Sequence, residues 1–72
     1  MKTYAWDFRG LRAAAIAEHH AEHLREFLQR EGLEGCEVWV ETPAQFQATA
    51  FLRATTPAQA GVERALRPPR VV

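Results

Sequence analysis

The sequence predicts an α+β fold in the order β-α-β-β-α, with a three-stranded antiparallel sheet and two helices on one of its faces. Three observations lead to this prediction. Apolar and polar residues alternate near the start and in the middle of the chain, a long segment between them has helical periodicity, and Thr-Pro-Ala-Gln at 56–59 is typical of a helix start. At 72 residues, we expect positions 1–72 to form a single domain.

The first predicted strand covers residues 2–8. Tyr4, Trp6 and Phe8 alternate with smaller or polar residues there, so we expect the three aromatic rings to lie on the core side of the sheet.

From position 11 to about 31 the apolar period becomes helical, and Gly32 is placed to end this helix in a left-handed conformation. The buried stripe of the helix is expected to contain Ala13, Ala17, Ile16, His20, Leu24, Phe27 and Leu28.

Residues 36–42 and 45–53 are predicted to form a hairpin, because both segments alternate and Pro43 interrupts them. On the first of these strands, Cys36, Val38 and Val40 should face the helices. On the second, the inward set should be Phe46, Ala48, Ala50 and Leu52. A second helix is predicted from Thr56, as N-cap of a capping box with Gln59, to about position 67.

A right-handed crossover between the first two strands gives the strand order 1-3-2, a ferredoxin-like layout that lacks its fourth strand. The outer edge of the first strand is then unpaired, and unpaired edges attract other strands. Either the same strand of a second subunit or the tail residues Val71 and Val72 could fill it.

Composition narrows the function classes. No apolar run approaches the length of a membrane span, and residues 1–8 lack the apolar core of a signal peptide, so we expect a cytoplasmic protein without a membrane partner. The formal net charge of zero makes nucleic acid an unlikely partner. The chain has eight Arg, one Lys and no Asn, which fits a thermophile, although GC-rich codon usage explains the same bias.

All three histidines lie within five residues. His19 and His23 are one helical turn apart and could bind zinc or nickel, with Glu22 or Glu26 or with ligands from a second segment or subunit. The alternative is that they form a solvated helix border. His20 falls in the apolar stripe, so we expect it to be packed and uncharged. Cys36 is the only cysteine and is expected to act as a small buried apolar residue rather than as a nucleophile.

Trp39 and Phe51 should lie on the sheet face that the helices leave open. Large aromatic side chains in such a place are typical of an interface. They could also stack on nucleobases, but Glu37 and Glu41 on the same face would repel phosphates.

The chain has no phosphate-binding loop, nucleophile elbow or paired carboxylates, so the sequence does not favour an enzyme. A chain this short is marginally stable, and a single cysteine allows no internal disulfide. We therefore predict a non-catalytic binding or structural module that forms a homodimer or a higher oligomer. The alternatives are a metal-binding module and a ligand-binding regulatory domain.

Overall fold

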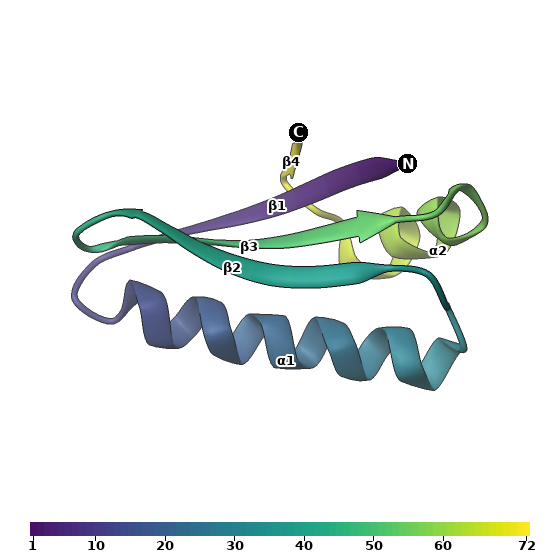
Figure 1. Cartoon of the computed structure of the whole chain (residues 1–72), viewed down its shortest axis with the longest axis horizontal. Helices are drawn as coiled ribbons and strands as arrows, with labels where there is room; N and C mark the ends of the chain where they lie inside the picture. Colours follow the sequence, from purple (N-terminus) through teal and green to yellow (C-terminus); the bar gives the residue numbers. More distant parts are fainter.

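A four-stranded antiparallel sheet forms the framework of the molecule, and the computed structural model describes all 72 residues (Figure 1). Along the chain the elements are β1 (Lys2–Arg9), α1 (Ala13–Glu31), β2 (Glu37–Ala44), β3 (Gln47–Ala54), α2 (Thr56–Leu66) and β4 (Arg70–Val71). The strands are arranged in the order β2-β3-β1-β4. The α+β class is therefore confirmed, and β3 lies between β1 and β2 as predicted.

The prediction of only three strands was wrong, because the tail after Pro68 and Pro69 forms β4 beside β1. Val71 pairs with Tyr4, and the Val72 amide donates a hydrogen bond of 2.8 Å to the Thr3 carbonyl. Two residues are too few for an alternating pattern to be recognised. Of the two candidates for the unpaired β1 edge, the tail of the same chain is therefore the one that occupies part of it.

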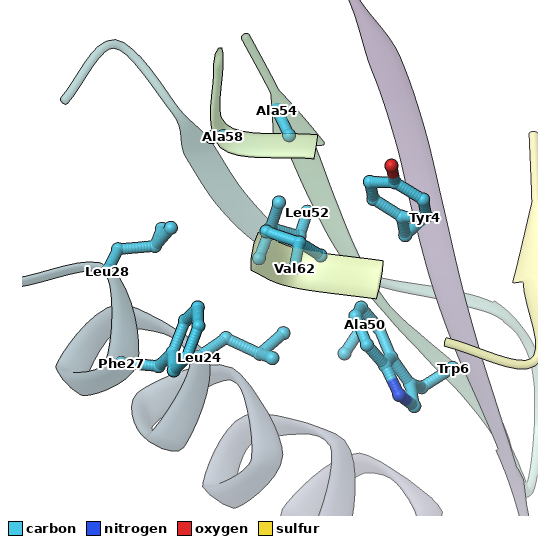
Figure 2. Packing of buried hydrophobic residues seen from close by; sticks show 10 residues of the cluster. All are labelled: Tyr4, Trp6, Leu24, Phe27, Leu28, Ala50, Leu52, Ala54, Ala58 and Val62. Atoms are coloured by element: carbon cyan, nitrogen blue, oxygen red, sulfur yellow. The ribbon is translucent and has the colours of Figure 1, made fainter. Parts of the chain in front are cut away.

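Both helices pack against the same face of the sheet, and the core lies between these two layers (Figure 2). As predicted, Tyr4 and Trp6 are buried on this face, with Phe8 partly buried beside them. The main cluster combines side chains from β1, β3 and both helices: Tyr4, Trp6, Leu24, Phe27, Leu28, Ala50, Leu52, Ala54, Ala58 and Val62.

The buried hydroxyl of Tyr4 has a partner at the edge of the core. It donates a hydrogen bond of 2.6 Å to Glu63 Oε2, which also accepts one of 2.9 Å from Lys2 Nζ. Burial and the Glu63 carboxylate raise the pKa of Tyr4. This contact joins β1 to α2 and satisfies a polar group that would otherwise be costly to bury.

Helix α1 is rotated relative to the predicted stripe, and Ile16 is 46% exposed rather than buried. At about 100° per residue, Ile16 lies roughly 90° from the centre of the arc that contacts the sheet. The alanines on this arc allow the helix to approach the strands closely, so that small side chains rather than Ile16 fill its first half. The buried residues are Ala13, Ala17, Ala21, Leu24, Phe27 and Leu28.

The hairpin turn lies later in the sequence than predicted. Pro43 does not end β2, since β2 is an edge strand whose pairing register shifts between Glu41 and Ala44. Phe46, predicted to face inward, instead lies in the turn with φ of 63° and is 50% exposed. A left-handed backbone conformation at a bulky residue costs of order 1 kcal/mol. The turn at Phe46 therefore combines a strained backbone with an exposed aromatic ring.

The helix ends agree only in part with the ends predicted from the sequence. Gly32 ends α1 with φ of 68°, as predicted. At α2 the N-cap is Thr55 rather than Thr56, and no side chain caps the helix. Gln59 Nε2 instead donates to the Ala54 carbonyl at 3.4 Å, so the predicted capping box is absent.

Candidate interface on the open face of the sheet

One row of side chains crosses all four strands on the face opposite the helices. The pairing registers place Trp39 of β2 opposite Phe51 of β3, Phe51 opposite Ala5 of β1, and Ala5 opposite Arg70 of β4. Because side chains alternate along a strand, all four point to the open face. Trp39 and Phe51 therefore lie on the predicted face. Their direct pairing depends on the hairpin register, which the sequence did not specify.

The rings of Trp39 and Phe51 stack on one another. Their centroids are 5.1 Å apart and their planes differ by 15°. Trp39 Nε1 donates a hydrogen bond of 2.9 Å to Glu41 Oε2, so the polar edge of the indole is satisfied. Both side chains are partly buried. This pair forms an apolar platform on the β2–β3 side of a face that no helix covers.

Charges on this face are separated from one edge to the other. Acidic Glu37 and Glu41 lie on β2 at one edge, whereas Arg9 and Arg70 lie on β1 and β4 at the other. Arg53 forms an ion pair with Glu37 between the two edges. The open face is therefore acidic along β2, where Trp39 also lies. It carries only a small excess of positive charge on β1 and β4, because Asp7 of β1 pairs with Arg70.

Asp7 connects the last strand to the sheet. Its carboxylate accepts hydrogen bonds from Arg70 Nε at 2.8 Å, from Arg70 Nη2 at 3.0 Å and from Thr49 Oγ1 at 2.7 Å. The Arg70 guanidinium and the Thr49 hydroxyl lower the pKa of Asp7. Asp7 and Arg70 are 63 residues apart, and no sequence pattern linked them. Beside them, Phe51 borders a hollow of about 320 Å³.

The contact between Asp7 and Arg70 should make the attachment of β4 sensitive to acid. Because the folded pKa of Asp7 is lowered, its contribution to stability is present above the unfolded pKa and is lost as pH falls through the folded pKa. We expect Arg70→Ala to lower the midpoint of urea unfolding at pH 7. The difference in midpoint between this variant and the wild type should become smaller as the pH falls and Asp7 is protonated. A difference that does not change with pH would contradict this assignment.

The three histidines fall into two environments on α1. His19 and His23 lie on its exposed side, with their Nε2 atoms 2.9 Å apart. His20 packs against the rings of Trp6 and Phe8, with centroid distances of 4.9 and 5.7 Å. Its Nε2 is buried without a partner, and burial lowers the pKa of His20. The prediction that His20 is packed and uncharged thus agrees with its surroundings.

The structure does not assemble a larger ligand set or a catalytic group around Cys36. No three or more His, Cys, Asp or Glu side chains are grouped so as to hold a metal ion. Cys36 is partly buried against the core and borders a hollow of about 640 Å³ between the end of α1 and β2. No histidine lines this hollow, so the structure does not place a histidine base beside the thiol.

Comparisons with known protein families, curated proteins and solved structures found no match to this chain. Neither helix combines the length and apolar character needed to cross a membrane.

Proposed function

We propose that this chain works in the cytoplasm as a homodimeric, non-catalytic binding or structural module, whose ferredoxin-like domains associate through their open sheet faces. One observation carries this proposal. The stacked Trp39 and Phe51 lie on the edge strand β2 and its neighbour β3, on a sheet face that the chain itself leaves uncovered. Large apolar side chains in such a place are typical of interaction surfaces.

Association through a sheet edge is less well supported. On one side, β4 and the Val72 amide occupy part of the β1 edge. On the other side, β2 contains Pro43 and a register shift, two features with which natural edge strands avoid pairing. The open face is therefore the better candidate surface.

The distribution of charge favours a second copy as the partner, in one orientation. In a two-fold dimer, the same patch serves both subunits and must complement itself. A two-fold axis parallel to the strands places β2 over the partner's β4 and β3 over the partner's β1. This arrangement sets Glu37 and Glu41 against the more basic edge of the partner. An axis perpendicular to the strands would instead oppose the two acidic edges.

The same orientation also brings an aromatic ring over a guanidinium. Trp39 lies over the partner's Arg70, whereas Ala5 is already fully buried within its own subunit and offers no surface to Phe51. A guanidinium over an indole ring is favourable by about 0.5–1 kcal/mol at an exposed site. In a two-fold dimer this contact between Trp39 and Arg70 forms twice.

The size of the face sets the expected strength. Strands about 4.8 Å apart, with residues rising by about 3.3 Å, give the three long strands and the two-residue β4 a face of roughly 400 Å² per subunit. The two subunits would then bury roughly 800 Å², which is the size of a weak, transient interface. We therefore expect a dimer that dissociates on dilution.

Sedimentation velocity of the untagged protein tests this proposal. Between about 1 μM and about 1 mM, we expect a reversible shift from the 8.2 kDa monomer to twice that mass. The fluorescence of Trp39, measured in a Trp6→Phe background, should move to shorter wavelength over the same range as the indole loses water. A monomer at every concentration would contradict the proposal.

A further inference from the structure

The exposed side of α1 carries two imidazole rings whose nitrogens converge. His19 and His23 have ring centroids 4.5 Å apart, at an angle of 75°. Their Nε2 atoms are 2.9 Å apart in solvent. With neutral rings, this contact requires one Nε2 to carry a proton and the other to present a lone pair. If the ring that carries this proton changes tautomer, so that the proton is on its Nδ1, both Nε2 lone pairs are free and can point at one cation.

A carboxylate lies behind one of the two rings. Glu26 Oε1 is 3.5 Å from His23 Nδ1, on the side of the ring away from His19. Metal-binding histidines commonly direct their second nitrogen to a carboxylate, which fixes the tautomer and increases the basicity of the ligating nitrogen. Glu26 thus favours the tautomer of His23 in which the Nε2 lone pair is free.

The separation of the two nitrogens indicates the kind of ion. Metal–nitrogen bonds of about 2.1 Å to atoms 2.9 Å apart enclose an angle of about 90° at the metal. This is the angle between neighbouring ligands in square-planar and octahedral complexes, whereas tetrahedral zinc prefers about 109°. We propose that His19 and His23 chelate one divalent transition-metal ion of square-planar or octahedral preference, copper(II) or nickel(II), with water completing its coordination.

This site is separate from the proposed dimer interface and goes beyond it. Helix α1 covers one face of the sheet (Figure 1). The strand registers place Trp39 and Phe51 on the other face, and the side chains of His19 and His23 are exposed to solvent. Because no third ligating side chain joins them, the site is open rather than closed like a structural zinc centre.

Isothermal titration of the untagged chain with copper(II), nickel(II) and zinc(II) tests the proposal. We expect saturable binding of one ion per chain, tightest for copper and weaker for zinc than for nickel. His19→Gln and His23→Gln should each abolish saturable binding. Glu26→Gln should weaken it about tenfold, as is typical when the second partner of a metal-bound histidine is lost.

Three matched controls complete the experiment. His20→Leu removes the inward-facing histidine, and Cys36→Ser removes the thiol; both should bind with wild-type affinity. Trp39→Thr should also bind the metal ion with wild-type affinity. The metal-binding proposal would therefore remain valid if the dimer proposal failed. Nickel should raise the melting temperature of the wild type but not of the His19→Gln variant, because the ion binds only the folded helix. Zinc binding as tight as copper binding, or binding that survives His19→Gln, would overturn the proposal.

Discussion

Replacing Trp39 with Asp is expected to convert the protein to monomers. The change removes the stack on Phe51 and adds a third carboxylate to an edge that already carries Glu37 and Glu41. Aromatic residues that become buried in an interface commonly contribute about 2 kcal/mol to binding, and losing this contribution weakens the dissociation constant by roughly 30-fold. Sedimentation velocity over a concentration series measures this shift.

Two further variants separate association from folding. Trp39→Thr keeps a residue with high strand propensity and should weaken the dimer while preserving the circular dichroism spectrum. Phe46→Asn removes another partly exposed aromatic ring, from the hairpin turn rather than the open face, and should leave the dimer unchanged. If the Trp39→Thr dimer has the same dissociation constant as the wild-type dimer, the stack stabilises only the fold of the monomer and the interface proposal is wrong.

Leu24→Ala is expected to be among the most destabilising single truncations. Leu24 is 1% exposed and lies in the main core cluster between the sheet and both helices. Truncating such a residue typically costs about 3 kcal/mol, through lost burial and the cavity that remains. A 72-residue domain has a total stability of roughly 4–11 kcal/mol, so this loss is a large part of it. Urea unfolding followed by circular dichroism measures the cost.

Ile16→Ala is the matched control on the same helix. The predicted stripe placed Ile16 among the buried residues, whereas the structure leaves it 46% exposed. We therefore expect it to cost less than about 1 kcal/mol, as is usual for substitutions near the surface. Equal losses from Ile16→Ala and Leu24→Ala would mean that α1 is rotated toward the predicted stripe.

The features that sequence analysis predicted well are those set by local backbone geometry. Strand alternation put Tyr4 and Trp6 inward, and the same period assigned Trp39 and Phe51 to the open face, because successive side chains of a strand point in opposite directions. The end of α1 at Gly32 follows from a conformation that glycine adopts readily. The packed position of His20 followed from helical periodicity alone.

Features that depend on a distant partner could not be predicted in this way. A two-residue strand such as β4 has no periodicity of its own. It exists because β1 offers unpaired backbone groups and Asp7 holds Arg70 from across the chain. The rotation of α1 about its own axis depends on how closely its alanines approach the sheet. The periodicity of apolar residues in the sequence does not indicate that distance. The hairpin register, and with it the place of Phe46, depends on a bulge that an edge strand tolerates.

The sequence by itself therefore determined the α+β class, the five longer elements and the face on which each aromatic side chain of the strands lies. These features follow from the side-chain period of 2 residues in strands and of 3.6 residues in helices. A short segment shows such a period without any distant partner. The tertiary structure alone decided the fourth strand, the stacking of Trp39 on Phe51 and the burial of Leu24 rather than Ile16. Each of these is a contact between segments far apart in the chain, whose free energy exists only once the sheet has formed.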